Sequence, residues 1–147
     1  MKRIILASAI LLSTTVLAAA SLDPLNVKTG LWQVTMTSKL NELAAPNTTT
    51  YESCVRKEDL NKYPFTDPGA NCTWNVVSST ASNMEANGTC MPEGMGEVKF
   101  SMHLEAPNSV TVKGTGQMTA NGPTGTMKGS YVGTAKWVGA NCPANVN

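Results

Sequence analysis

Apolar and polar residues alternate with a period of two along most of the chain from Lys28 onward. In the stretch GLWQVTMT, which begins at Gly30, Trp32, Val34 and Met36 are apolar and the residues between them are polar. This alternation is typical of a β-strand that buries one face. Clusters of Gly, Asn, Pro and Ser interrupt the pattern at short intervals, as turns between strands do. The chain is therefore predicted to be mainly β.

About seven such strands follow one another, and one short helix is expected in RKEDLNKYPF, before Pro64 ends it. Four glycines lie inside the later strands, at positions 114, 116, 129 and 133. Glycines within strands favour strong bending or close contact over a flat sheet. We expect a curved antiparallel sheet or a lipocalin-like up-and-down barrel. The glycine two positions before Trp32 is also found in lipocalins, and we expect this tryptophan to fill one end of the core.

The first twenty residues, MKRIILASAILLSTTVLAAA, have the features of a cleaved secretory signal peptide. Lys2 and Arg3 precede an apolar run that ends in small residues, with Ala18 and Ala20 at the spacing of a cleavage site. The run is shorter than the roughly 20 apolar residues of a membrane-spanning helix. We expect cleavage after Ala20, export to a bacterial periplasm, no membrane span in the mature protein, and a single β-rich domain over residues 21–147.

Composition argues against several classes of function. Lys2 and Arg3 are two of eleven basic residues, so the mature chain has nine against ten acidic ones, a net charge of −1. No basic cluster is present to bind nucleic acid. His103 is the only histidine, and no nucleophile stands in a pattern that would pair with it. No glycine-rich phosphate loop opens a helix. We expect neither an enzyme nor a bound cofactor.

Four cysteines follow the signal, an even number that indicates two disulfides in an exported chain. Zinc is disfavoured, because no two of them have the close spacing of a structural zinc site. The segment CTWNVVSSTASNMEANGTC is predicted to form a hairpin in which Cys72 faces Cys90. The same register pairs Trp74 with Gly88, Val76 with Ala86 and Ser78 with Met84. That pairing leaves Cys54 to join Cys142.

A second hairpin is predicted from EVKFSMHLEA and SVTVKGTGQM, which flank Pro107 and Asn108. A three-residue loop with Asn108 in the left-handed region would connect them. This loop would pair Leu104 with Val110, Met102 with Val112 and Phe100 with Gly114.

Seven of the eight methionines follow the signal. Thioether ligands suit Cu(I) or Ag(I), and Met91 and Met95 flank one loop, so a methionine-based metal site is one alternative. Met102 and His103 do not support it, because adjacent strand residues point to opposite faces. Methionine also fills irregular cores and apolar ligand sites. No metal ligands are therefore assigned.

Three segments together resemble the bacterial exported family known as domain of unknown function 3617. They are TGLWQVTMT after the signal, YESCVRKEDL, and YVGTAKWVGANC near the end, with a pair of cysteines around a hairpin between them. The resemblance extends from Gly30 to Cys142. It implies a small periplasmic domain with disulfides and carries over no reaction and no functional residues. The Met/Pro-rich stretch usual in the family after the first strand is reduced here to LNELAAPN.

The favoured hypothesis is a non-enzymatic periplasmic module that binds an apolar small molecule or an envelope protein. Its concave face carries more methionine and aromatic residues than a minimal core needs. The expected ligand-binding residues are Trp32, Met36, Trp74, Met102, Tyr131 and Trp137. The rival hypothesis is a structural or stress-response interaction protein with a filled core and an exposed patch or sheet edge.

Overall fold

The computed structural model describes residues 22–41, 45–60, 71–93, 96–122 and 125–146. The predicted signal peptide, Pro64 and Met95 lie outside these residues. Seven strands account for most of the described chain, with bounds β1 Gly30–Leu40, β2 Asn47–Val55, β3 Cys72–Ser79, β4 Asn83–Cys90, β5 Val98–Asn108, β6 Thr111–Gly122 and β7 Gly125–Gly139. The predicted short helix is present as a single 3₁₀ turn, η1, over Lys57–Asp59.

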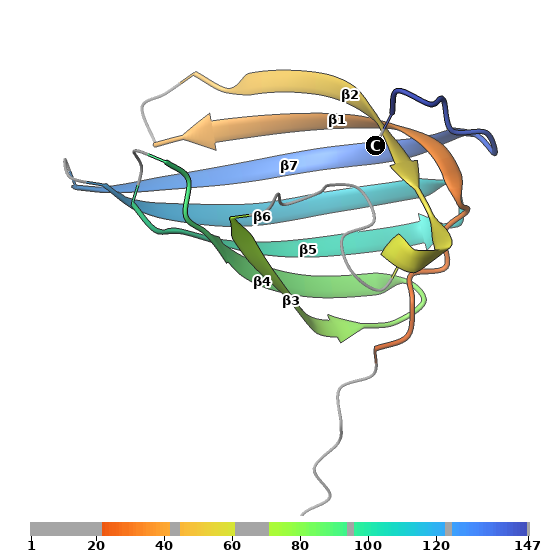
Figure 1. Cartoon of the computed structure of the whole chain (residues 1–147), viewed down its shortest axis with the longest axis horizontal. Coiled ribbons are helices and arrows are strands. Elements are labelled where there is room, and N and C mark those ends of the chain that lie inside the picture. Colours follow the sequence, from red (N-terminus) through yellow and green to blue (C-terminus); the bar gives the residue numbers. More distant parts are fainter. Residues whose placement is uncertain (1–21, 42–44, 61–70, 94–95, 123–124, 147) are drawn as a thin grey trace, which may run out of the picture.

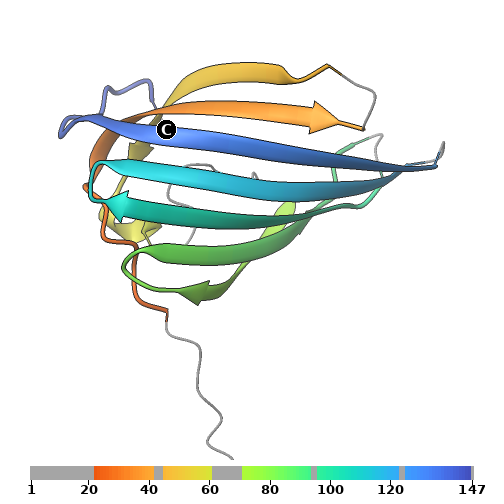
Figure 2. The same ribbon diagram turned by 180° about the vertical axis from the view of Figure 1, so that it is seen from behind.

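The seven strands form one open, curved, antiparallel sheet in the order β2-β1-β7-β6-β5-β4-β3 (Figures 1 and 2). Strands β3 to β7 follow one another as a meander, and β1 lies beside β7, so that β2 and β3 are the two edges. The prediction of a mainly β, curved antiparallel sheet is confirmed. Within the described residues, no helix has the length and apolar content needed to cross a bilayer.

The first predicted hairpin, now β3 and β4, is confirmed in part. Cys72 faces Cys90, and the next two predicted pairs are also present. The pairing of Ser78 with Met84 is wrong, because Val77 is an extra residue that shifts the register, so that Ser79 faces Met84. Such a β-bulge places two residues opposite one and increases the local twist.

The register predicted for the second hairpin, β5 and β6, is wrong by four residues. Leu104 faces Gly114, and Met102 and Phe100 are displaced in the same way, to Gly116 and Met118. Strand β5 continues through a bulge at Ala106 and Pro107, a place where sheets tolerate proline. Asn108 has no left-handed conformation. Its side-chain Oδ1 accepts a hydrogen bond from the Val110 N–H, and this contact closes a tighter turn.

Two disulfides join the same cysteine pairs that the hairpin register predicts. Cys72–Cys90 links β3 to β4 at a sequence separation of 18. Cys54–Cys142 links β2 to the chain beyond β7, across 88 residues. Disulfides of this kind are consistent with an oxidising, exported environment.

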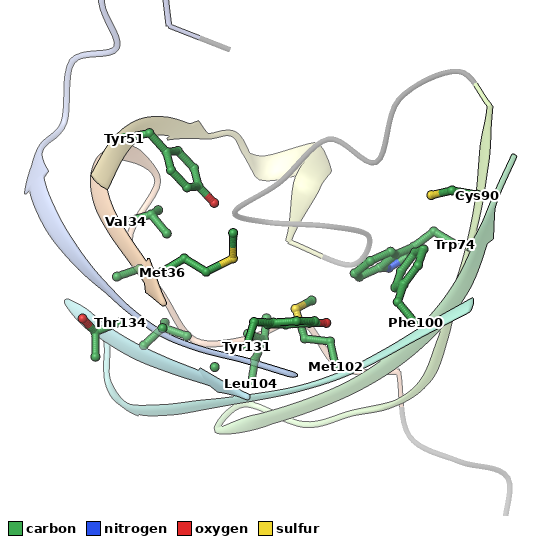
Figure 3. A pocket seen from close by; sticks show the side chains of 14 residues that line it. Val34, Met36, Tyr51, Trp74, Cys90, Phe100, Met102, Leu104, Tyr131 and Thr134 are labelled. Carbon is green, nitrogen blue, oxygen red and sulfur yellow. The ribbon is translucent and has the colours of Figure 1, made fainter. Parts of the chain in front are cut away.

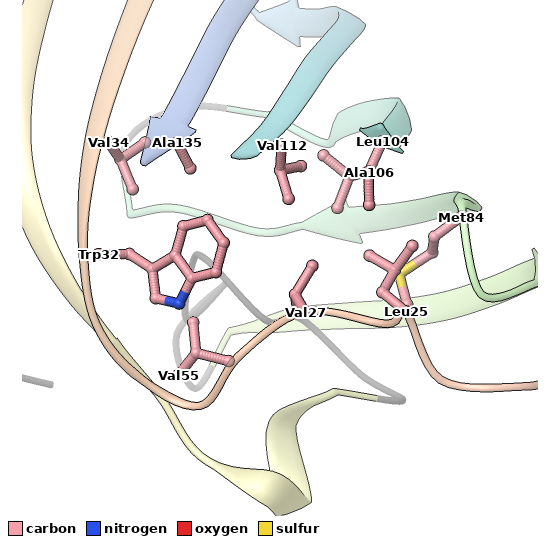
Figure 4. Close-up of a cluster of buried hydrophobic side chains, with 10 residues drawn as sticks. All are labelled: Leu25, Val27, Trp32, Val34, Val55, Met84, Leu104, Ala106, Val112 and Ala135. Carbon is pink, nitrogen blue, oxygen red and sulfur yellow. The ribbon is translucent and has the colours of Figure 1, made fainter. Parts of the chain in front are cut away.

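The main hydrophobic core fills one end of the curved sheet (Figure 4). Trp32 is completely buried there, as expected, and its indole N–H donates a hydrogen bond to the Lys28 carbonyl at 2.9 Å. Gly30 is required because its φ is +123° and a Cβ would overlap the Gly139 carbonyl oxygen. The N-terminal segment before β1 crosses this end and inserts Leu25 and Val27. We call this cluster the end core: Leu25, Val27, Trp32, Val34, Val55, Met84, Leu104, Ala106, Val112 and Ala135.

Removal of either disulfide should lower the stability, and removal of the longer link should lower it more. In the chain-entropy account, closing a loop restricts the unfolded chain, and the effect grows with loop length. The double variant C54A/C142A is expected to lose roughly 4.5 kcal/mol of unfolding free energy, and C72A/C90A roughly 3 kcal/mol. Urea unfolding of the oxidised protein and both variants measures this. Equal losses, or a larger loss for C72A/C90A, would contradict the expectation.

Candidate ligand-binding cavity

The concave face is built from rows of side chains that run across the strands. One row consists of Met36, Gly133, Gly114, Leu104 and Met84, each opposite the next in the sheet register. The row beside it contains Ser38, Tyr131, Gly116, Met102, Ala86 and Val76. Because strand residues alternate between faces, all of these point inward.

Two glycines are adjacent at the centre of the first row. Gly114 of β6 faces Gly133 of β7, so the floor of the sheet carries no side chain there. A Cβ on Gly114 would lie 3.1 Å from Leu104 Cδ2, and one on Gly133 would lie 3.1 Å from the Thr35 carbonyl oxygen. These neighbours lie to the side of the glycine pair, and both glycines line a hollow beside the end core.

The ring of Tyr131 covers the next part of the floor. It extends from β7 over Gly116 of β6, where a Cβ would overlap the ring atoms, and reaches β5. There its hydroxyl donates a hydrogen bond to the Ser101 carbonyl at 2.8 Å. The ring is held flat on the sheet, with one face against glycine and the other toward the hollow (Figure 3).

The far wall of the hollow is aromatic. Trp74 of β3 and Phe100 of β5 pack with ring centroids 5.3 Å apart and an angle of 37° between their planes. Phe100 covers Gly88, where a Cβ would overlap the ring. Figure 3 shows this pair on one side of the hollow, with Tyr51 and Val34 on the other.

The resulting cavity has a volume of about 280 Å³ and is open on one side. It lies along the middle of the concave face, next to the end core. Its lining comes from all seven strands and consists of Val34, Met36, Tyr51, Trp74, Cys90, Phe100, Met102, Leu104, Val112, Gly114, Tyr131, Gly133, Thr134 and Ala135.

The described part of this lining carries no ionisable group other than two tyrosines. Burial raises the pKa of Tyr131 to about 12, and burial also raises the pKa of Tyr51 above 10.0. Both hydroxyls are therefore neutral at ordinary pH. The described lining therefore offers apolar surface and neutral hydroxyl groups to a ligand.

Four of the six expected ligand-binding residues line the cavity: Met36, Trp74, Met102 and Tyr131. The other two do not. Trp32 lies in the end core. Trp137 packs against that core, where Lys28 Nζ lies 4.5 Å from its ring centroid and its indole N–H donates to the Thr29 carbonyl at 3.1 Å.

Several lining residues were not anticipated from the sequence, chiefly Tyr51, Phe100 and the pair Gly114 and Gly133. Phe100 had a signal, since it alternates in phase with Met102. Gly114 and Gly133 were expected to bend the sheet, but their placement opposite each other depends on the register between β6 and β7.

The other candidate sites are not assembled in the described residues. Met91 is 58% exposed, and Met95 lies outside the described chain. His103 lies on the outer face, with Nδ1 3.8 Å from Glu85 Oε1. Among the described residues no group of three His, Cys, Asp or Glu side chains is placed to hold a metal ion.

Comparison with known proteins gives one family and little else. The family model described as "Protein of unknown function (DUF3617)" matches residues 27–142. No curated protein matches the chain. Among solved structures, a redesigned β-barrel is similar over 82% of this chain and 100% of its own, with 9% sequence identity and a TM-score of 0.25. A likeness this weak does not bear on the fold.

Tyr131→Phe should reduce the loss of stability above pH 10. In the unfolded chain this tyrosine ionises near 10.0, and in the folded protein near 12. The unfolded state therefore loses the proton first, and the free energy of unfolding falls as the pH rises between these values, with the full contribution present below pH 10. Urea unfolding at pH 8, 9, 10 and 11 measures the slope. A variant curve as steep as that of the wild type would show that another group causes the loss.

Proposed function

The chain belongs to the DUF3617 family of proteins of unknown function, and on that premise we propose that it is a periplasmic, non-enzymatic module that binds an apolar small molecule in the cavity. The observation that carries the proposal is the hollow over the glycine pair Gly114 and Gly133. A sheet that served only as a scaffold would gain stability by filling this space, because close packing stabilises a core and glycine weakens a strand.

The size and lining of the cavity suit a small ligand. An engineered apolar cavity of about 150 Å³ binds benzene, so 280 Å³ accommodates a molecule with about two rings or a short acyl chain. Mostly apolar walls with a few polar groups are usual for small-molecule sites. Both sides of the hollow are lined with aromatic and methionine side chains, which provide large contact area. These features favour a small molecule over an envelope protein as the occupant.

Two further observations support export. The pair of disulfides fits an oxidising compartment, and the first twenty residues have the pattern of a signal peptide. An apolar carrier without charged groups in its site is suited to a compartment where membrane-derived and other apolar molecules must cross water. We propose no reaction at this site, since its described lining carries no histidine, lysine, arginine or carboxylate side chain.

The direct test fills the hollow with one added side chain. Gly114→Leu places a side chain on the bare floor, against the flexible end of Leu104. Its matched control is Thr115→Leu, the next residue on β6, which points to the outer face. We expect Gly114→Leu to bind the fluorescent probe 1-N-phenylnaphthylamine at least tenfold more weakly than the wild type, and Thr115→Leu to bind it normally.

Unfolding measurements on the same proteins guard against misfolding. A strand glycine costs about 0.5–1 kcal/mol relative to alanine. This gain offsets the small shift that Leu104 Cδ2, 3.1 Å from the added Cβ, must make, so Gly114→Leu should unfold within about 1 kcal/mol of the wild type. Loss of probe binding together with retained stability supports a ligand site. Unchanged probe binding in Gly114→Leu, or a wild-type protein that binds no probe, would contradict the proposal.

Export is tested separately by N-terminal sequencing of protein recovered from the periplasm of a bacterial host. Cleavage after Ala20 gives a mature chain that begins SLDPLN. Recovery of the protein with residues 1–20 still attached would contradict the export part of the proposal. The result for the cavity would not be affected.

A further inference from the structure

The cavity presents unequal surfaces to a ligand, and its floor is a fixed aromatic ring. Tyr131 is held at two points, by contact with Gly116 below it and by the 2.8 Å hydrogen bond from its hydroxyl to the Ser101 carbonyl. The ring crosses β6 between these points, so its upper face is directed into the cavity (Figure 3). An aromatic ring held in this way needs no rearrangement before another flat group stacks on it.

The groups around this ring also favour an aromatic occupant. Met36 and Met102 line the same cavity as Tyr131, and thioether sulfur makes favourable contacts with aromatic rings. The tilted pair Trp74 and Phe100 forms the wall at one side. Aromatic rings prefer offset-stacked or edge-to-face neighbours, and this cavity offers a partner for each arrangement.

The two tyrosines differ in their free hydrogen-bonding capacity. The Tyr131 hydroxyl already donates to the Ser101 carbonyl, so it has no proton left to donate to a ligand. Tyr51, on the edge strand β2, is 37% exposed and makes no hydrogen bond to another described residue through its hydroxyl. Figure 3 shows this hydroxyl directed into the cavity, opposite Trp74 and Phe100.

The described lining offers no partner for a charged group on the ligand. No Lys, Arg, His, Asp or Glu side chain contributes to the described lining. An ion moved from water into apolar surroundings without a partner loses its hydration and gains nothing in return. An uncharged ligand therefore suits the described lining better than a carboxylate or an ammonium group does.

We propose that the cavity takes an uncharged, planar aromatic molecule of about two fused rings, which stacks on Tyr131 and accepts one hydrogen bond from the Tyr51 hydroxyl. This inference rests on the proposed function and specifies the class of ligand. Tyr131 is then the platform that sets the plane of the ligand, and Tyr51 sets its direction in that plane.

The test uses four related probes on the full mature protein, with affinities measured by isothermal titration calorimetry. They are 2-acetylnaphthalene, naphthalene without the acceptor, 2-acetyldecalin without the aromatic plane, and 2-naphthoate with a charge. We expect 2-acetylnaphthalene to bind most tightly. The expected loss is about fivefold for naphthalene and for 2-acetyldecalin, and at least tenfold for 2-naphthoate.

Tyr51→Phe removes the hydroxyl alone, from a partly exposed position on an edge strand, so the fold is retained. This variant should bind 2-acetylnaphthalene about fivefold more weakly, and naphthalene as well as the wild type does. The difference between the two probes should therefore disappear. Naphthalene acts as the control for any general change in the cavity.

The outcomes separate this inference from the proposed function. Equal affinity for 2-acetyldecalin and 2-acetylnaphthalene, or a Tyr51→Phe variant that keeps the preference for the acetyl group, would overturn the inference while an apolar binding site remains. Tightest binding of 2-naphthoate would overturn the exclusion of charge. If the wild type binds none of the four probes and no 1-N-phenylnaphthylamine, both proposals fail.

Discussion

A single sheet with one apolar face must cover that face, and in this protein no second layer is described that does so. The sheet meets the requirement by curving around its own inner surface, while the N-terminal segment closes one end. Leu25 and Val27 come from that segment and are buried beside Trp32. The end core thus depends on a piece of chain outside the sheet, and Lys28 connects the two through its carbonyl contact with the Trp32 indole.

The cavity begins where the N-terminal segment and the end core no longer cover the inner face of the sheet. In the row next to the end core, two glycines lie at the centre with Met36 and Leu104 on either side of them. Gly114 and Gly133 leave the floor bare, while Gly116 and Gly88 have aromatic rings lying over them. A glycine is covered where a neighbouring side chain is long enough to lie over it, and it is left bare where none is. Tyr131 is long enough to cross β6 and bond to β5, whereas Met36 and Leu104 stand on either side of the glycine pair and do not close it.

The sequence was sufficient to predict the parts of this fold that depend on local alternation. Inner and outer faces follow from the period of two, and the disulfide pairs follow from one hairpin register. That register fails only at Val77, where a bulge adds a residue that no pattern marks. The β5–β6 register fails for a similar reason. Pro107 was interpreted as part of a turn, but it lies in a bulge, and the Asn108 side chain closes the turn two residues later.

The candidate site was less accessible to prediction than the fold, because a cavity is a property of registers between strands. Parity identified Met102 and Tyr131 as inward-facing, yet parity also selected Trp137, which packs against the end core. Alternation predicts whether a side chain lies on the inner or the outer face. It does not predict which residues of the neighbouring strands lie beside it. The β5–β6 turn lies between Asn108 and Thr111, later than predicted, and together with the one-residue bulge before it this displaces β6 by four residues and brings Gly114 opposite Leu104. The separate register between β6 and β7 places Gly114 opposite Gly133. The hollow therefore depends on how many residues the bulge and the turn contain. The alternation of apolar and polar residues does not show this number.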